Sequence, residues 1–395
     1  MSRTVSLILV DGDGAPAGAL PPFDVDLPYW QEVSCVVRGA RERYGVDVTV
    51  LRLLAAERPA PHGGSVTYLA QVGDVGGRRR VDPAVHPHRA PYAWPGGPAA
   101  SLRWASDVLA ELGHGVVSDV EQQRTWNLSA IWRLGTARGP VWLKQVPRFF
   151  THEATVLAWI ADRVAGERLV PPLLAAGDDG RMLLAHVEGD DLYGADLATR
   201  DAIAADMHRI QLATRDKEVE LIRAGVPDRR AVSLLEWTAD VVARYGGGEP
   251  ALHALVDGLP ERLSTVESCG LPDTLVHGDL HPGNVRGTSE RRALIDWGDS
   301  FIGHPAFDIL RLTEDAPPAA AAQLIDAWAA RWRAAVPGCA PERTVELLRP
   351  VEALRSAAVY ANFLDNIEPS EHPYHVADVP ACLRAAVDQA RRSPP

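Results

Sequence analysis

The sequence has few cysteines, very little lysine and no long apolar segment. Its four cysteines lie far apart without a Cys-x-x-Cys pair, which argues against a disulfide framework or a zinc site. Lys144 and Lys217 are the only lysines in a chain with many arginines. No apolar run reaches the length of a membrane span. The apolar run at residues 5–10 meets two aspartates within three residues and does not resemble a secretory leader. A cytoplasmic protein is therefore expected.

The acidic net charge argues against two classes of binding partner. The formal net charge is −12 and the sequence pI is about 5.5, whereas a nucleic-acid-binding protein is expected to carry a basic face. The same balance argues against binding to an anionic membrane surface. At 395 residues the chain is longer than one compact domain of about 100–200 residues. We therefore expect several domains, with neither nucleic acid nor membrane as a partner.

Two short segments in the second half of the chain carry the strongest functional signal. Residues 275–285 read Leu-Val-His-Gly-Asp-Leu-His-Pro-Gly-Asn-Val, and residues 293–298 read Ala-Leu-Ile-Asp-Trp-Gly. They contain Asp279, Asn284 and Asp296. Phosphoryl transfer needs a carboxylate that accepts the proton of the attacking hydroxyl, and oxygen-bearing side chains that hold Mg²⁺ against the phosphates. This pattern supplies all three groups.

Together the two segments resemble the signature of the aminoglycoside phosphotransferase and choline kinase family, whose members share the protein-kinase-like fold. The resemblance implies that Asp279 is the catalytic base and that Asn284 and Asp296 are ligands of Mg²⁺. It implies an α+β, bilobal fold, with a small β-rich nucleotide lobe and a large helical lobe. The segment Gly-His-Pro-Ala-Phe-Asp at residues 303–308 also fits the family, in which the final aspartate, Asp308, tends to be structural.

Two other interpretations of the first segment stay open. The alternating residues His277, Asp279 and His281 could be metal ligands of a hydrolase on one face of a strand. Pro282-Gly283 would end such a strand, however, and the positions of Asn284 and the later aspartate would then be coincidental. In the other interpretation, His277 and Asp279 form a buried hydrogen-bonded pair without a catalytic role.

An alternating segment at residues 141–146 predicts the strand that carries the phosphate-binding lysine. Apolar residues alternate around Lys144, and a buried lysine needs an anionic partner. Glu153 begins the next predicted helix and is the natural candidate. In the family, such a Lys–Glu pair holds the α and β phosphates of the donor, which is ATP or GTP. The alternative is an exposed lysine on an edge strand.

Other nucleotide contacts are less defined. The turn at residues 124–129 contains no glycine, unlike the glycine-rich loop of protein kinases, so Asn127 or Ser129 would have to donate to the phosphates. By the resemblance, backbone groups near His186 and Val187 hold the adenine ring.

The sequence gives little information about the residues of the acceptor site. Asp190, Asp191 and Asp365 are its candidate residues because they fall near the predicted edges of the active site. The alternative for each is an ordinary acidic residue on the surface.

The first 95 residues predict a small α/β domain of their own. Residues 4–10, 46–54 and 65–72 are expected to be strands, residues 29–45 a helix, and the Gly- and Pro-rich residues 12–22 a loop. A nucleotide lobe at 96–186 and a helical lobe at 187–395 follow.

Residues 38–46 weakly resemble the end of a Nudix motif. Gly39 and Arg43 stand where two of the metal-binding glutamates of that motif should be. We therefore expect a Nudix-like shape without hydrolase activity, or an unrelated α/β cap. A homodimer formed through this domain is a further expectation.

The function that these observations favour is Mg²⁺-dependent transfer of the γ-phosphate of ATP to a hydroxyl of a small molecule. An antibiotic is the leading acceptor class, because the resemblance points there first, and antibiotic resistance would be the role. One alternative is a metabolic kinase for a sugar or amino alcohol. Another is a nucleotide-binding pseudokinase, which is expected to lack one of the key residues, whereas Lys144, Asp279, Asn284 and Asp296 are all present.

Overall fold

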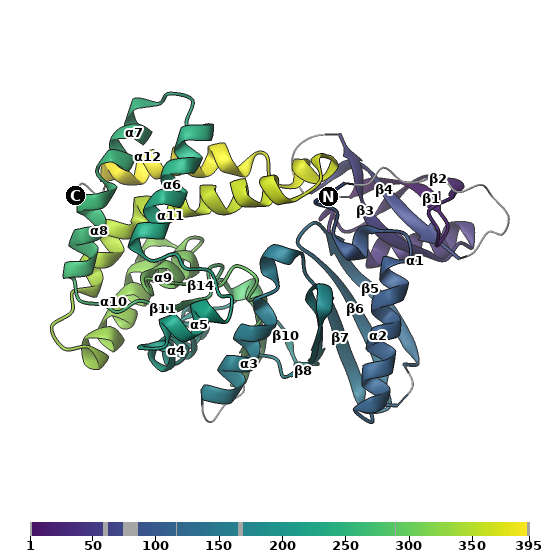
Figure 1. Cartoon of the computed structure of the whole chain (residues 1–395), viewed down its shortest axis with the longest axis horizontal. Helices are drawn as coiled ribbons and strands as arrows, with labels where there is room; N and C mark the ends of the chain where they lie inside the picture. The colour runs from purple at the N-terminus through teal and green to yellow at the C-terminus, as the bar shows by residue number, and fades with distance from the viewer. Residues whose placement is uncertain are drawn as a thin grey trace. The chain divides into compact units, whose positions relative to one another are not determined.

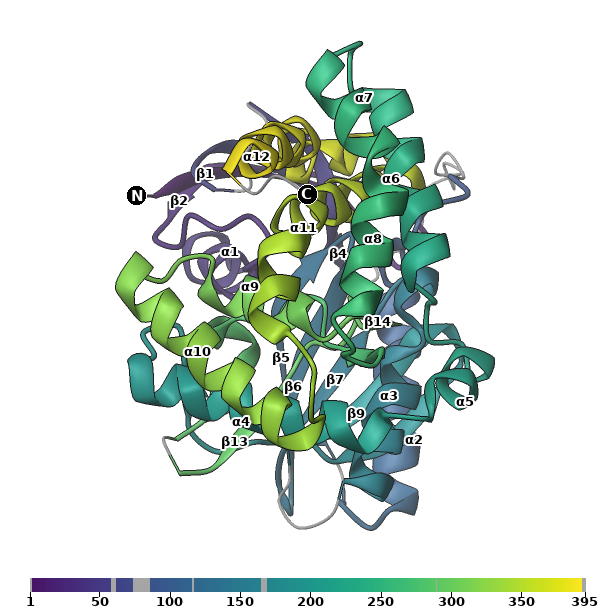
Figure 2. The same cartoon turned by 90° about the vertical axis from the view of Figure 1, so that its left-hand side faces the viewer.

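The structure is a computed structural model that describes residues 2–57, 62–73, 86–115, 117–164, 169–288 and 290–392. It is 49% helical and 24% strand. The chain divides into two compact units. The first contains residues 1–151, 173–186 and 362–377, and the second contains residues 152–172, 187–361 and 378–395. The element order is labelled in Figure 1, and Figure 2 shows the same cartoon turned by 90°.

The first unit contains two sheets and two main helices. Its elements are β1 (Arg3–Val10), β2 (Pro16–Val25), α1 (Ser34–Tyr44), β3 (Val48–Ala56), β4 (Gly64–Val72), η1 (Pro91–Ala93), α2 (Gly97–Glu111), β5 (Asp119–Trp126), β6 (Ser129–Thr136), β7 (Gly139–Gln145), η2 (Arg148–Phe150), β8 (Leu173–Gly177), η3 (Asp178–Gly180), β9 (Arg181–Ala185) and η5 (Pro369–Tyr374).

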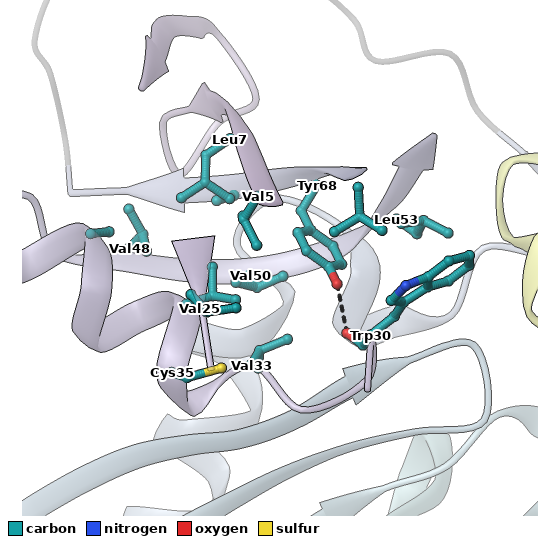
Figure 3. Packing of buried hydrophobic residues seen from close by; sticks show 14 of the residues in the cluster. Val5, Leu7, Val25, Trp30, Val33, Cys35, Val48, Val50, Leu53 and Tyr68 are labelled. Carbon is teal, nitrogen blue, oxygen red and sulfur yellow. Dashed lines mark hydrogen bonds between the residues drawn. The ribbon is translucent and has the colours of Figure 1, made fainter. Parts of the chain in front are cut away.

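The N-terminal sheet has the strand order β2-β1-β4-β3, with β1 and β4 parallel and the other pairs antiparallel. Alternation along β1 buries Val5 and Leu7, which pack with residues of β3, β4 and α1 into one apolar cluster. Figure 3 shows this core, including the bond that the Tyr68 hydroxyl donates to the Trp30 carbonyl at 2.7 Å. The bond satisfies the buried hydroxyl of Tyr68. The helix that the sequence predicted at residues 29–45 begins later in the structure, at Ser34.

The second sheet of this unit is antiparallel, with the order β5-β6-β7-β9-β8. Buried side chains of α2 and of β6, β7 and β9 share one core. The two sheets are joined through Gln122 on β5, whose amide accepts from the Val50 N–H at 2.9 Å and donates to the Val50 carbonyl at 2.7 Å. The N-terminal sheet and the second sheet are therefore hydrogen-bonded to each other within the first unit.

A short segment from the far end of the chain completes the first unit. Glu368 accepts a bidentate pair of bonds from buried Arg89, at 2.8 and 2.7 Å. Tyr374 belongs to the N-terminal core. The neighbouring His375 ring lies 2.9 Å through Nε2 from the Oδ1 atom of Asn127, in the turn between β5 and β6. These contacts attach residues 362–377 to both sheets.

The second unit is mainly helical. Its elements are α3 (Glu153–Arg163), β10 (Asp190–Asp191), α4 (Leu197–Thr214), α5 (Glu218–Arg223), α6 (Ala231–Tyr245), α7 (Pro250–Asp257), α8 (Leu259–Ser268), β11 (Thr274–Val276), η4 (Pro282–Asn284), β12 (Val285–Gly287), β13 (Arg292–Leu294), β14 (Phe301–Gly303), α9 (Ala306–Thr313), α10 (Pro318–Ala335), α11 (Pro341–Asn366) and α12 (Asp378–Arg392). The last residues of α11, from Asn362, belong to the first unit.

Two small sheets lie among these helices, β10-β12-β13 and β11-β14. Trp328 and Trp332 of α10 are buried, as expected for core residues. No helix in the described ranges combines the length and apolar character needed to cross a membrane.

One expectation from the sequence was wrong in an instructive way. Residues 12–22 were expected to be a loop, but Pro16–Val25 form β2, which pairs with β1 along one edge of the N-terminal sheet. Proline is tolerated on an edge strand, where its missing N–H can face away from the ladder. The three-domain division at residues 95 and 186 stays a prediction. One boundary between the two compact units falls after residue 186, and the others fall after residues 151, 172, 361 and 377.

Candidate active site

The candidate catalytic loop begins at the end of β11 and is held through its backbone by α9. The Asp308 carboxylate accepts bonds from the His277 N–H at 3.1 and 3.2 Å and from the Gly278 N–H at 3.2 Å. Gly278 has φ +85°, and a Cβ atom there would lie 2.1 Å from the Asp299 carbonyl oxygen. Glycine is therefore required at this turn. Burial raises the pKa of Asp308 to about 7, although the N–H donors act in the opposite direction.

The Asp279 side chain projects from this loop into a set of hydrogen-bond donors. Its Oδ1 accepts from the Arg311 Nε at 2.8 Å, and its Oδ2 accepts from the Asn284 Nδ2 at 3.0 Å. The Nε2 atom of His281 lies 3.5 Å from Oδ2. Burial alone would raise the pKa of Asp279, but the His281 ring and the Arg311 guanidinium outweigh it and hold the pKa well below its usual range. The carboxylate is therefore ionised at neutral pH and can accept a hydrogen bond from an acceptor hydroxyl.

The two predicted metal ligands are brought together by the β12–β13 hairpin. Val285 pairs with Leu294 in this ladder, and the Ile295 N–H donates to the Asn284 carbonyl at 2.9 Å. Asp296, the next residue, has φ +64°. Because the Asn284 Nδ2 donates to Asp279, its Oδ1 is the amide atom suited to a metal. An amide oxygen and a carboxylate are both donor groups that fit Mg²⁺.

The segment after Asp296 is tied to the start of α3. The Trp297 N–H donates to the Glu153 Oε1 at 3.2 Å, and the His152 Nε2 lies 3.1 Å from the Ser300 carbonyl. Glu153 is buried, and so is the Trp297 side chain, whose Nε1 donates to the Leu294 carbonyl at 3.0 Å. Glu153 thus supports the segment that carries Asp296, a contact that its predicted pairing with the strand lysine did not anticipate.

The geometry of His277 does not fit the hydrolase alternative. Its ring is fully buried, with Nε2 3.0 Å from the Ile295 carbonyl and Nδ1 accepting from the Asp279 N–H at 3.4 Å. Burial lowers the pKa of His277 to about 4, so the ring is neutral. Both ring nitrogens are engaged by the backbone, and among the residues that the structure describes no group of three His, Cys, Asp or Glu side chains is arranged as a metal site.

In the first unit, the structure places Lys144 on β7, which is flanked by β6 and β9 and is not an edge strand. Its side chain is buried, with 6% exposure, which excludes the alternative of an exposed edge lysine. Ser129 is also buried, and its Oγ accepts from the Trp126 Nε1 at 3.1 Å. The His186 Nδ1 accepts from the Trp142 Nε1 at 3.0 Å. The nucleotide-binding roles of Lys144, Ser129 and His186 stay predictions.

The candidate acceptor residues lie in different parts of the chain. Asp190 and Asp191 form β10, which pairs with β12, and Asp191 accepts from the Arg286 Nη1 at 2.9 Å. The Nε atom of the same arginine donates to the Val187 carbonyl at 2.9 Å, which leaves that oxygen one lone pair for a further donor. Asp365 is exposed near the end of α11, in the first unit. Contact of any of them with an acceptor stays a prediction.

Arg311 and Arg355 were not identified from the sequence, and His281 was considered only as a metal ligand of the hydrolase alternative. Arg311 binds the Asp279 carboxylate, and buried Arg355 donates to the Gly278 carbonyl at 3.0 Å while paired with Glu352 at 2.7 Å. His281 is oriented by the Gly283 N–H, which donates to its Nδ1 at 3.0 Å. Arg311 follows Asp308 by three residues in a predicted helix, so this spacing was the one available signal.

Comparison with known protein families agrees with this geometry. Residues 118–344 match the phosphotransferase enzyme family, which is more than half of the chain. The chain therefore belongs to this family. It is an enzyme of the small-molecule phosphotransferase type, as the two motifs predicted.

Solved structures share the fold at low sequence identity. Wild-type aminoglycoside 2'-phosphotransferase-IIIa, solved as its GDP complex, has a TM-score of 0.51 at 17% identity, covering 74% of this chain and 99% of that chain. Macrolide 2'-phosphotransferase MphH from Brachybacterium faecium has 0.52 at 18%, covering 75% and 99%. Choline kinase LicA from Streptococcus pneumoniae has 0.54 at 14%, covering 73% and 99%. The α+β, protein-kinase-like fold is thus confirmed. No curated protein matches the chain.

Proposed function

We propose that the protein transfers the γ-phosphate of a nucleoside triphosphate, ATP or GTP, to a hydroxyl of a small molecule, with an antibiotic as the leading acceptor class. The observation that carries this proposal is the arrangement of Asp279, Asn284 and Asp296. The side-chain amide of Asn284 donates to the Asp279 carboxylate at 3.0 Å. The main-chain carbonyl of Asn284 accepts from the N–H of Ile295, the residue before Asp296, at 2.9 Å. This arrangement supports a proton acceptor close to the two residues that would hold Mg²⁺, as phosphoryl transfer requires.

In this mechanism the chain positions the reactants. Asp279 accepts a hydrogen bond from the attacking hydroxyl and orients it. Asn284 and Asp296 would hold Mg²⁺, which neutralises charge on the phosphates when bound. Lys144 would bind the α and β phosphates, and its burial supports that role because a buried ammonium needs an anionic partner. A cytoplasmic location is proposed with this function, because the nucleotide donor is found there.

An acceptor screen tests the proposal. The purified protein is mixed with Mg²⁺, ATP or GTP, and a panel of hydroxyl-bearing antibiotics, sugars and amino alcohols, and the acceptors are analysed by mass spectrometry. One added phosphate on an antibiotic is the expected result. The same addition to a sugar or amino alcohol instead would identify a metabolic kinase. Nucleotide binding without transfer to any acceptor would contradict the proposal and favour the pseudokinase alternative.

Matched variants show whether the transfer belongs to this site. Asp279→Ala should abolish it, whereas Asp326→Ala changes an exposed aspartate on α10 and should leave it unchanged. Equal activity in both variants would show that the transfer arises elsewhere, for example from a contaminating kinase.

A further inference from the structure

Helix α9 presents three charged residues at successive turns toward the catalytic loop. Asp308, Arg311 and Glu314, the residue that caps the helix, are spaced three apart and so lie along one face. Asp308 binds the loop backbone through the N–H groups of His277 and Gly278. Arg311 binds the Asp279 side chain, and Glu314 accepts from the Nη1 atom of Arg311 at 2.8 Å. One helix therefore holds both the backbone and the reactive carboxylate of the loop.

The Asp279 side chain needs such support. The residue lies in a bend outside any helix or strand, and its side chain is 34% exposed. A carboxylate has about four acceptor positions. Arg311 occupies one on Oδ1, and Asn284 occupies one on Oδ2, with His281 near the same oxygen. Few positions are left, so an incoming hydroxyl can bind the carboxylate in few orientations.

The contact with Arg311 differs from an ordinary surface ion pair. Its Nε bonds to Asp279 while its Nη1 bonds to Glu314, so the planar guanidinium is fixed at two separate atoms. Its side chain is only 24% exposed. Without this cation, the Asp279 carboxylate would lose its partner on Oδ1 and would face Glu314 without an intervening positive charge.

We propose that Arg311 is a positioning residue for phosphoryl transfer, which holds the Asp279 carboxylate in the orientation that receives the acceptor hydroxyl. This inference rests on the proposed function. A displacement of about 1 Å at a reacting group can lower the rate by about 100-fold. Loss of Arg311 should therefore lower kcat, while the KM of the nucleotide stays close to that of the wild type, because the Arg311 guanidinium bonds to the Asp279 carboxylate and to Glu314.

The test compares three variants of the full-length protein with the acceptor that the screen identifies. Arg311→Ala should lower kcat by about 100-fold. Arg311→Lys keeps the positive charge without the planar fork and should recover part of the loss. The matched control is Arg331→Ala, which removes a similarly exposed arginine (23%) bonded to Asp201 at 2.6 Å on α10 and α4. It should retain the wild-type kcat.

Two further measurements separate positioning from general damage to the fold. Guanidinium ion at millimolar concentration should partly restore turnover to Arg311→Ala but not to Asp279→Ala, since only the former leaves a cavity of the right shape beside an intact carboxylate. Thermal unfolding should show that Arg311→Ala is folded at the assay temperature, with Arg331→Ala as the reference for the loss of one ion pair. If Arg311→Ala does not fold, Arg311→Lys and its kcat decide the question.

The outcomes separate this inference from the proposed function. A wild type that transfers phosphate to no hydroxyl overturns the function and the role of Arg311 with it. An active wild type with an Arg311→Ala variant that keeps its kcat overturns the role of Arg311 alone. A variant that loses nucleotide affinity and keeps kcat also overturns it. A fall in kcat with partial recovery by lysine or guanidinium supports it.

Discussion

The candidate catalytic loop and the β5–β6 turn, for which the sequence predicted catalytic and nucleotide-binding roles, are held by different kinds of contact. The candidate catalytic loop of the second unit is held by charged groups: Asp308 on its backbone N–H groups, Arg355 on a carbonyl and Arg311 on the Asp279 carboxylate. The β5–β6 turn of the first unit is held mainly by aromatic packing and neutral hydrogen bonds, with one ion pair, Arg124–Glu32 at 2.6 Å, on the strand that leads into it. Trp126 lies against Tyr374 and His375, with ring centroids 5.6 and 5.7 Å away.

The difference follows from what each turn contains. The catalytic loop presents an ionised carboxylate, and a carboxylate that is partly removed from water needs charged partners. The β5–β6 turn has no glycine and presents large and amide side chains, which are fixed by shape and by His375. We therefore expect the catalytic loop to be sensitive to the removal of charge, and the turn to be sensitive to the removal of volume or of a buried hydrogen bond.

The largest effect should come from the catalytic loop itself. Asp279→Ala removes the group that would accept the acceptor proton, and general-base contributions are about 10²–10⁴-fold. We expect kcat to fall by at least about 1,000-fold while the affinity for Mg-ATP, measured by calorimetry, stays close to that of the wild type. A fully active variant would show that Asp279 is not the catalytic carboxylate. The charged contacts of the loop would then have no catalytic group to support, and the loop would not differ from the β5–β6 turn in this respect.

A smaller loss of activity is expected when Lys144 on β7 is replaced. Lys144→Met keeps most of the buried volume and removes the ammonium that would bind the α and β phosphates. We expect a rise in the nucleotide KM together with a fall in kcat, combined to about 100-fold in kcat/KM, which is about 2.7 kcal/mol. The control is Lys217→Met, which changes the other lysine of the chain, exposed at position 217. Unchanged steady-state constants for Lys144→Met would exclude the phosphate-binding role.

The third variant, His375→Ala, tests how the β5–β6 turn is held. His375→Ala removes the bond to Asn127 in a fully buried setting, and a buried amide oxygen left without a donor costs about 1–3 kcal/mol. The free energy of unfolding, measured in urea, should fall by this amount, with kcat affected less than in Arg311→Ala. His372→Ala, three residues earlier and only half-buried, is the control. A large loss of kcat with unchanged stability would show that the turn contributes to chemistry directly.

The sequence predicted the residues of the candidate catalytic loop far better than the aromatic contacts of the β5–β6 turn. Asp279, Asn284 and Asp296 lie within eighteen residues and form a pattern that few other chemistries need. Regular alternation placed Lys144 on a buried strand. The strand at Pro16–Val25 was missed because its two consecutive prolines indicate a loop, and its pairing with β1 is a tertiary contact that local propensity does not reveal.

The contacts of residues 362–377 could not be predicted for a related reason. His375 and Asn127 are 248 residues apart in the chain, and Glu368 and Arg89 are 279 apart. Neither pair has a local spacing that marks it, because side chains that meet across distant elements carry no periodic signal. Arg311 is the intermediate case, since its spacing from Asp308 is regular but its partner became evident only once the loop was placed.

The last effect concerns pH and the buried acids of the first unit. Burial and the nearby Glu368 carboxylate together raise the pKa of Glu371 to about 8, against the opposing effect of Arg52. Because the folded-state pKa lies above the unfolded value near 4.5, the folded protein binds this proton more tightly. The stabilisation is complete below about pH 4.5 and is lost as the pH rises through about 8.

Glu371→Gln removes this titration and keeps the shape of the side chain. We expect its free energy of unfolding to depend less on pH than that of the wild type, by up to about 1.4 kcal/mol per pH unit between pH 5 and 8, measured as urea unfolding at several pH values. Glu111→Gln, which changes an exposed glutamate at the end of α2, should follow the wild-type curve. Identical curves for Glu371→Gln and the wild type would mean that Glu371 is ionised in the folded protein, and the aromatic region would then depend on charge much as the catalytic loop does.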